Sequence, residues 1–309
     1  MAVKRIGLFG NFGSGNLGNE GSLEAMLLFL RKAHPEADLV CICADPDAAG
    51  KQHGVETLPI RAPRTANGGK LGKVVARVRD HIGVFRNVRS LDALLIPGTG
   101  ILDDFGERPI GFPYSLFLVC LMAKLRGIPV AFVSTGAGPI HHPLSRWLMK
   151  SAAGMAAYRS YRDVISKEFM ESIGFDASHD PIYPDLAFRL PDPASTERPR
   201  ERALTIGIGV MAYYGWSGDA ESNAAIYQLY MKKLAAFAIW LLNSGYRVRI
   251  LIGDVLDHSA VQDLTQAIAE GTGRQPEEMV AKDPQSLNDV MDEISGLDVV
   301  VATRFHNIL

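Results

Sequence analysis

The sequence has few cysteines, almost no net charge and no long apolar run, and each shortage excludes a class of protein. Its three cysteines, Cys41, Cys43 and Cys120, fall in apolar stretches, and their odd number disfavours a disulfide framework or a zinc site. A net charge of −2 gives no overall attraction to nucleic acid. The longest apolar stretch, 114–123, is too short to span a bilayer, and residues 1–5 lead into a strand without a signal peptide. We therefore expect a cytoplasmic protein.

The sequence does contain a regular alternation of short apolar segments and amphipathic ones. Hydrophobic residues make up 47% of the chain and charged residues 21%, as in ordinary globular proteins. Strands are expected at 6–9, 39–43, 91–96, 129–134, 204–210, 246–252, 278–281 and 297–302, and helices at 113–126, 144–157, 163–172, 224–242, 258–270 and 285–294. This alternation predicts an α/β fold of parallel sheets with helices on both faces.

A polar, proline-rich stretch at 191–200 separates two such regions and is typical of a linker between domains. A chain of 309 residues is also long for a single hydrophobic core. We predict two α/β domains, 1–192 and 203–309, with a cleft between the carboxyl ends of their sheets. The final apolar run, 297–302, is expected to be a buried parallel strand.

A glycine-rich loop follows the first predicted strand. Gly13, Gly15 and Gly18 have the G-x-G-x-x-G spacing of a dinucleotide-binding loop, and Asp45 is placed to bind a ribose. Two observations disfavour that interpretation: extra residues follow Gly10, and polar groups that a pyrophosphate does not need lie within the loop, at Asn16, Asn19 and Glu20. We favour ligand binding through the amides of the following helix, with a tight turn that requires positive φ as the alternative.

Two further predicted strands end in glycine-rich turns, at 98–104 and 134–139. Either turn alone is weak evidence, because glycine commonly permits tight connections between strands and helices. Three such turns in one half of the chain predict a binding surface at which the backbone can approach a ligand closely. In the second turn, Asp103 is expected to be structural, whereas Asp104 is either a proton-transfer group or an acid favoured by a helix start.

Three charged residues are candidates for binding and catalysis. Arg162 precedes a predicted helix whose N-cap is Asp163, so that it either contacts an anion at the rim of the domain or forms a surface ion pair. Arg159 is a less favoured substitute. Arg304 and His306 follow the last predicted strand, where open α/β sheets bind ligands. There the arginine can neutralise an anion and the histidine can transfer a proton near neutral pH.

The segment 61–89 is strongly basic, with six arginines, two lysines and one acidic residue. Its apolar residues lie roughly on one face of a helix. Such a helix either covers its own domain or rests on an anionic membrane surface. Peripheral contact with the inner face of the membrane therefore remains an alternative to a wholly cytoplasmic location.

With these motifs in order, the chain resembles the polysaccharide pyruvyl transferase family. The matching segments are 15–20, 98–104, 136–139, 162–166 and 304–306, which together span almost the whole chain. The sequence departs from the family's pattern at three positions, none of them a charged catalytic group: Asn19, Thr99 and Phe305. The family also usually continues well past the Arg-x-His motif, so we expect the second domain to be incomplete at its C-terminus.

The resemblance implies two Rossmann-like domains that face a cleft, as in GT-B glycosyltransferases. It also implies transfer of a pyruvyl group from phosphoenolpyruvate to sugar hydroxyls of a cell-surface polysaccharide or its precursor, lipid-linked or not, with formation of a ketal. No metal or cofactor is expected. His306 is the implied catalytic residue and Arg162 and Arg304 are the implied donor-binding residues, while the loops of the substrate cleft contain Gly15, Asn16, Gly18, Glu20, Gly98, Thr99, Gly100, Asp104, Gly136 and Gly138.

Two other functions fit the same pattern. One is a GT-B-type glycosyltransferase that uses a nucleotide sugar, for which no clear ribose-binding acid is found in 204–309. The other is a non-catalytic homologue that binds glycan precursors. The acceptor sugar and the oligomeric state are not predicted, although the aromatic residues in 213–216 either stack on a sugar or pack within the protein.

Overall fold

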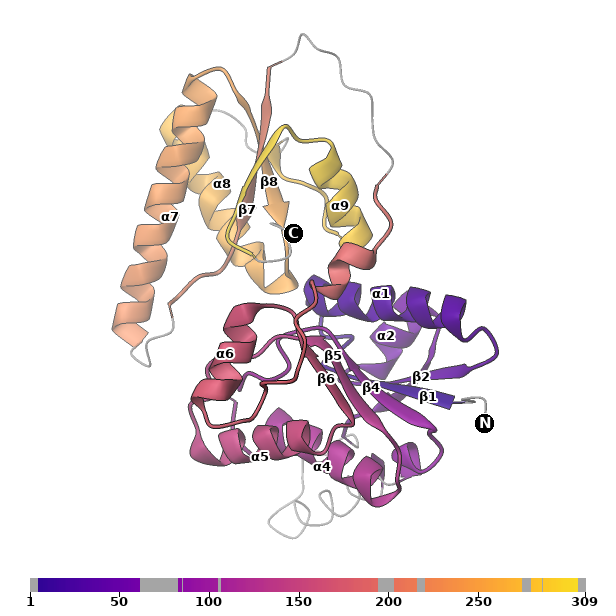
Figure 1. Ribbon diagram of the computed structural model, residues 1–309. Helices are drawn as coiled ribbons and strands as arrows, with labels where there is room; N and C mark the ends of the chain where they lie inside the picture. The colour runs from indigo at the N-terminus through magenta and orange to yellow at the C-terminus, as the bar shows by residue number, and fades with distance from the viewer. Residues whose placement is uncertain are drawn as a thin grey trace, which may run out of the picture. The chain divides into compact units, whose positions relative to one another are not determined.

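The computed structural model describes residues 5–61, 83–84, 86–104, 107–193, 203–215, 220–273, 279–284 and 286–304, and the chain divides into two units (Figure 1). Unit 1 comprises Met1–Ser14 and Gly18–Leu190, and unit 2 comprises Gly15–Leu17 and Pro191–Leu309. Each unit is built on its own parallel sheet.

Unit 1 contains a six-stranded sheet in the order β3-β2-β1-β4-β5-β6, and all neighbouring strands are parallel. The strands are β1 (Arg5–Phe9), β2 (Asp38–Cys43), β3 (Glu56–Pro59), β4 (Ala93–Pro97), β5 (Val130–Thr135) and β6 (Tyr158–Tyr161). The strand order reverses between β1 and β4. In doubly wound sheets the crevice for ligands lies at this reversal, outside the carboxyl ends of the strands.

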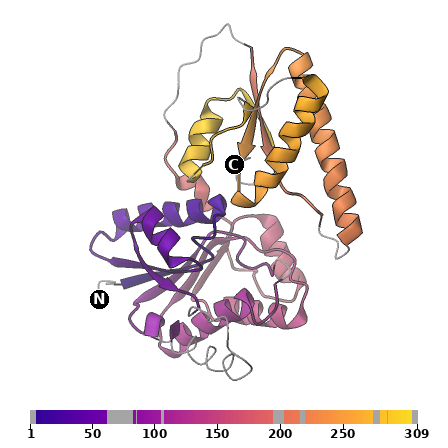
Figure 2. The same cartoon turned by 180° about the vertical axis from the view of Figure 1, so that it is seen from behind.

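Helices cover both faces of the unit 1 sheet (Figures 1 and 2). They are α1 (Leu17–Ala33), α2 (Pro46–His53), α4 (Phe112–Leu125), α5 (Pro143–Gly154) and α6 (Val164–Ser172), followed by the short 3₁₀ helix η1 (Leu186–Arg189). One face forms a core in which Leu23 and Leu27 of α1 meet Leu8 and Cys41. The opposite face forms a larger core around Leu94 and Leu116 and the other residues of their cluster.

Unit 2 contains a three-stranded parallel sheet in the order β8-β7-β9. Its elements are β7 (Thr205–Val210), α7 (Ala220–Asn243), β8 (Arg247–Ile252), the 3₁₀ helix η2 (Val255–Asp257), α8 (His258–Thr272), α9 (Leu287–Ser295) and β9 (Val299–Ala302). Ile208 and Ile250 lie at the centre of its main hydrophobic cluster, together with apolar residues of α7 and α8 such as Ala238 and Leu264.

The predicted α/β class is confirmed, and most expected strands lie within two residues of the observed ones. The prediction that the last strand is buried is wrong. Strand β9 pairs only with β7 among the described strands, and Val299 and Val301 are 48% and 42% exposed. Of the strand expected at 278–281, residue 278 is outside the described part, and Val280 forms an isolated bridge to Ile250.

Helix α2 and strands β3 and β6 were not predicted from the sequence. Strand β6 reads Tyr-Arg-Ser-Tyr and β3 reads Glu-Thr-Leu-Pro, so neither contains the apolar run that marked the other strands. Most of the basic segment 61–89 lies outside the described residues. Among the described helices, none combines the length and apolar character needed to cross a bilayer.

Candidate functional site

Strained backbone marks the carboxyl ends of β4 and β5 in unit 1. Thr99 and Ser134 adopt φ values of +60° and +51°, and Gly98 adopts +54°. Positive φ is uncommon for residues other than glycine, and such strain tends to accumulate at ligand-binding sites. The two turns are bonded to each other, since the amide of Gly136 donates to the carbonyl of Thr99 at 2.7 Å. This hydrogen bond therefore fixes the backbone conformation of the two turns relative to each other.

Arg162 follows β6 and lies over Gly136 at the end of β5. A Cβ atom on Gly136 would come within 2.6 Å of the Arg162 Nε, so that only glycine allows the guanidinium to occupy this place. The backbone amide of Arg162 donates to Thr135 at 3.1 Å, while its Nη1 donates to Asp185 at 3.4 Å. Its Nε lies 3.5 Å from the carboxylate of Asp163. The arginine is thus held at the carboxyl edge with 19% of its side chain exposed.

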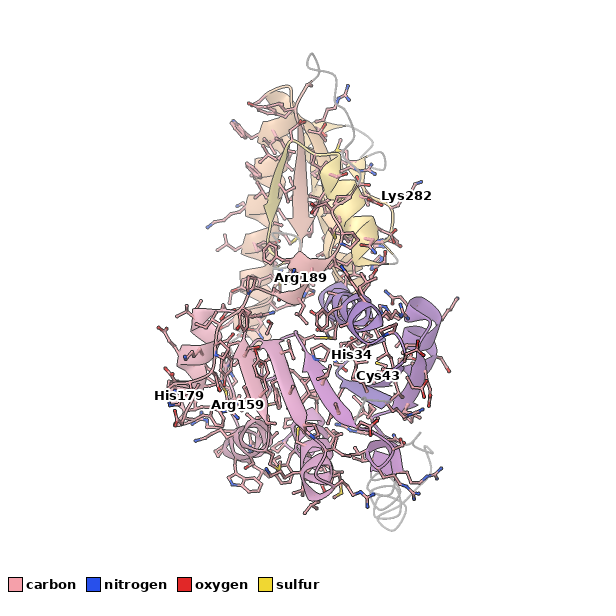
Figure 3. The ribbon with its side chains drawn as sticks, turned by 45° about the vertical axis from the view of Figure 1, so that its right-hand side comes forward. His34, Cys43, Arg159, His179, Arg189 and Lys282 are labelled. Carbon is pink, nitrogen blue, oxygen red and sulfur yellow. The ribbon has the colours of Figure 1, made fainter. Side chains whose placement is uncertain are left out.

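Arg159 has a structural role instead. It lies within β6, two residues before the strand ends, and forms a bidentate pair with Asp180 at 2.8 and 3.0 Å. The guanidinium also donates to the carbonyls of Ala153 and Ala156 and lies over the ring of Phe175. Figure 3 shows Arg159 on the same side of unit 1 as His179. These contacts join β6 to its neighbouring segments. They explain the position of Arg159 within the fold, and no bound ligand is needed to explain it.

Two other glycines also make room for side chains of this chain. A Cβ on Gly138 would collide with the carboxylate of Asp103, and one on Gly98 would lie 2.6 Å from the hydroxyl of Ser22. A ligand at these turns would therefore meet side chains as well as bare backbone. Gly100 follows Thr99 in the same turn.

Asp104 is buried, and its carboxylate accepts hydrogen bonds from the amides of His141 and His142 at 2.9 and 3.1 Å. It therefore fixes the loop between β5 and α5. His142 in turn caps α5 by accepting from the amide of Leu144. Of the two roles considered for Asp104, these bonds support a structural one.

Glu20 fixes the conformation of the first glycine-rich loop by accepting a hydrogen bond from it. The buried carboxylate of Glu20 accepts from the amide of Gly13 at 2.7 Å and lies 3.0 Å from the ring nitrogen Nε2 of His53. Gly13 itself has a φ of +75°, and the carbonyl of Asp45 occupies the space where its Cβ would be. Gly15, with a φ of +81°, and Asn16 directly precede α1, and Gly18 lies in its first turn.

Arg304, just after β9 in unit 2, is held by two carboxylates. Its Nε and Nη2 donate to the two oxygens of Asp257 at 2.7 and 2.8 Å, and its Nη1 lies 3.7 Å from Asp254. Burial alone would lower the pKa of Arg304, but the hydrogen bonds and charge of Asp257, with a contribution from Asp254, raise it. The arginine is therefore fixed in position and always charged.

Asp257 joins the carboxyl ends of the three strands described in unit 2. Its side chain is fully buried, and it accepts from the amide of Ala212, which follows β7, as well as from Arg304, which follows β9. It lies itself after β8. The hydroxyl groups of Thr303 and Tyr230 meet at 2.9 Å beside this cluster. Asp254 and Asp257 were not predicted from the sequence, because their only local signal is their position just beyond a strand.

His306 lies outside the described residues, as does Trp216. The tyrosines that precede Trp216 pack on α7: Tyr214 stacks on Tyr227 with ring centroids 4.6 Å apart, and Tyr213 meets Tyr230 edge-on at 5.9 Å. Packing within unit 2 therefore accounts for both rings. In the described part of the chain, no group of histidine, cysteine or carboxylate side chains is arranged to hold a metal ion.

Both units thus place an arginine at the carboxyl edge of a parallel sheet, the edge where α/β proteins bind ligands. In unit 2, Asp257 takes two of the five N–H donors of Arg304, and Asp254 lies 3.7 Å from Nη1, beyond hydrogen-bond distance, so that donors on Nη1 and Nη2 can still reach an anion. Such a site can bind carboxylate or phosphate groups, for which the arginine fork is suited.

Two Rossmann-like units with these sites at their strand ends define a GT-B-like fold. Similar solved structures include the Staphylococcus aureus MnaA–UDP co-structure, with a TM-score of 0.59 and 9% identity over 98% of this chain and 74% of that one. A putative UDP-N-acetylglucosamine 2-epimerase from Listeria monocytogenes has a TM-score of 0.58 and 13% identity over 99% and 76%. UDP-GlcNAc 2-epimerase from Neisseria meningitidis has a TM-score of 0.58 and 10% identity over 97% and 77%.

These likenesses establish the fold alone. No curated protein matches the sequence. Residues 16–309 match the polysaccharide pyruvyl transferase family. The chain therefore belongs to this family of transferase enzymes.

Proposed function

We propose that the protein transfers the pyruvyl group of phosphoenolpyruvate to two hydroxyls of a sugar, forming a ketal on a cell-surface polysaccharide or its precursor. Family membership supports pyruvyl transfer. The observation that carries the choice of donor is the fixed, charged Arg304, since a rigid guanidinium suits a donor that bears both a carboxylate and a phosphate. Arg162, anchored over Gly136, is the second donor-binding residue of the proposal.

In this reaction, two sugar oxygens form bonds to the central carbon of the donor and the bond from that carbon to the phosphate oxygen breaks. Of the two hydroxyl protons, one goes to the enol methylene, which becomes a methyl group, and the other leaves with the phosphate. His306 is proposed to move these protons, because histidine titrates near neutral pH. The arginines stabilise the negative charge on the departing phosphate. No step requires a metal or a cofactor.

The experiment measures release of inorganic phosphate from phosphoenolpyruvate with a panel of lipid-linked, nucleotide-linked and free sugars. We expect His306→Ala to lower turnover by roughly 100-fold or more, the usual contribution of a general acid or base. His34→Ala is the matched control, because His34 is an exposed residue just past α1 (Figure 3), and it should leave turnover unchanged. Normal turnover by His306→Ala, or turnover of nucleotide sugars without phosphoenolpyruvate, would contradict the proposal.

A further inference from the structure

A small pocket lies at the carboxyl edge of the unit 1 sheet, on the side of β1, β2 and β3. Its volume is about 180 Å³. The described residues that line it come from the loops after these three strands, from the loop that precedes α4 and from the first residue of α4: Asn11, Ala44, Ile60, Arg61, Glu107 and Phe112. None of these residues has a role in the donor site proposed above.

Two polar groups of the pocket, those of Arg61 and Glu107, have hydrogen-bond partners that orient them. The Nε of Arg61 donates to the hydroxyl of Ser115 at 3.1 Å, and Ser115 is itself buried in α4. One carboxylate oxygen of Glu107 accepts from the amide of Phe112 at 3.0 Å. A ligand that binds here finds these groups already ordered, which lowers the entropic cost of binding.

One wall of the pocket is aromatic and rigid. The ring of Phe112 stacks on Phe9, with centroids 5.8 Å apart and an angle of 28° between the rings, and Phe9 is fully buried. The pocket thus combines a guanidinium donor, a carboxylate acceptor, the amide of Asn11 and an aromatic ring.

This combination fits a polyhydroxylated ring. Each sugar hydroxyl both donates and accepts hydrogen bonds, as a carboxylate and a guanidinium together require, and the apolar C–H groups of the ring can lie against an aromatic side chain. A free phosphate is less well suited, because the carboxylate of Glu107 offsets the positive charge of the Arg61 guanidinium. Pockets for drug-sized ligands measure roughly 300–1,000 Å³, so a space of this size accepts a single ring.

We propose that this pocket binds one sugar ring of the acceptor, a proposal that rests on the proposed pyruvyl transfer. The guanidinium of Arg162 lies over Gly136 at the end of β5, and β4 lies between β5 and β1. Two strand spacings, about 10 Å, therefore separate β5 from β1, the strand of the pocket that is nearest to the donor side. The ring in the pocket is the neighbour of the ring that receives the pyruvyl group, and the preferred acceptor contains at least two sugars.

The test compares Arg61→Gln with the unaltered protein in the phosphate release assay, using methyl glycosides of single sugars and of disaccharides. We expect the KM for the best disaccharide to rise about tenfold or more, whereas the KM for phosphoenolpyruvate and the turnover of single sugars stay within twofold. Arg61→Lys keeps the charge without the fork and should give an intermediate rise. The matched control is Arg89→Gln, an exposed position before β4 at the opposite edge of the sheet.

Calorimetry with the disaccharides alone separates this proposal from the proposed reaction, because it needs no donor. We expect binding that Arg61→Gln weakens about tenfold, and that Ala44→Phe weakens by filling the pocket from an exposed position. If no phosphate is released but these effects on binding are seen, the reaction fails and the sugar pocket stands. If the unaltered protein binds no disaccharide, or if all variants bind it equally well, the pocket proposal is overturned.

Discussion

At the scale of single residues, the position of Arg162 depends on Gly136. We predict that Gly136→Ala displaces the guanidinium, because the added methyl group would lie 2.6 Å from Nε. The expected result is a fall of about tenfold or more in kcat/KM for phosphoenolpyruvate, equivalent to about 1.4 kcal/mol, with little change in melting temperature. The measurements are steady-state phosphate release and a thermal melt.

Gly154→Ala provides the control, since a Cβ at this helix position would meet only Phe175, at 3.9 Å. It should leave kinetics unaltered. Equal activity of both variants would show that Arg162 is not needed where the structure holds it.

Asp257 has the corresponding role for Arg304. In Asp257→Asn an amide replaces one oxygen of the bidentate pair, so that the arginine loses its fixed orientation and part of the support for its charge. Hydrogen bonds to charged groups contribute about 1.5–3 kcal/mol, and we predict that kcat/KM for phosphoenolpyruvate falls roughly 10- to 100-fold. Asp263→Asn, at an exposed carboxylate bonded to Tyr227, should have no effect. Equal kinetics for the two variants would contradict this assignment.

The buried phenol of Tyr161 gives the protein a pH dependence at alkaline pH. Burial, with a contribution from the charge of Asp180, raises the pKa of Tyr161. The unfolded chain therefore loses this proton first, and the contribution of Tyr161 to the free energy of unfolding should be constant below about pH 10 and fall above it.

The hydroxyl of Tyr161 has no hydrogen-bond partner in the described part of the structure. Tyr161→Phe should thus be nearly neutral at pH 7 and should reduce the loss of stability at high pH. Denaturant titrations between pH 8 and 11 measure both effects, with the exposed Tyr158→Phe on the same strand as control. An unchanged slope for Tyr161→Phe would refute the prediction.

Site residues could be predicted from sequence only where their signal is local. Asp163 was predicted as an N-cap, and its side chain does accept from the amide of Ser166 at 2.6 Å, because capping involves residues three apart. Asp257 could not be found in this way, since it meets Arg304 across 47 residues of sequence. The same holds for the contact of Arg162 with Gly136, which exists only once β5 and β6 are paired.

At the scale of elements, the first glycine-rich loop depends on one helix residue. Glu20 of α1 accepts from the amide of Gly13 and contacts His53 of α2. Glu20→Gln keeps the shape but places an amide against the histidine ring, which we expect to cost about 1–3 kcal/mol of stability. The amide of Gly13 should exchange its hydrogen faster, as measured by hydrogen exchange. Glu36→Gln, at an exposed position, is the control, and equal exchange rates in the two variants would argue against this role.

The elements predicted correctly are those in which burial and periodicity agree. Strands β1, β2, β7 and β8 are apolar runs that become core, and they were predicted to within a residue. Strand β9 has the same apolar composition, yet one of its faces is exposed, because burial is decided by neighbours and not by the residues themselves. Strand β6 has few apolar residues and is held in place by pairing with β5 and by the bonds of Arg159.

At the scale of the whole molecule, each hydrophobic cluster of the described residues lies within one unit. We therefore predict that the chain unfolds in more than one step, as is usual for proteins with separate cores. Leu94→Ala and Ile250→Ala each create a cavity at a fully buried site and should cost about 2–5 kcal/mol, but in different units. Differential scanning calorimetry should show that each variant lowers a different transition. A common shift of a single transition would contradict the prediction.

All three cysteines of the chain are free and buried, and burial raises the pKa of the Cys120 thiol. Thiols of this kind react slowly, because the thiolate is the reactive form and reagents have no access to it. The natural background for maleimide chemistry is therefore low. A maleimide fluorophore would therefore label a single cysteine introduced on the surface almost selectively. The native cysteines would not have to be replaced first.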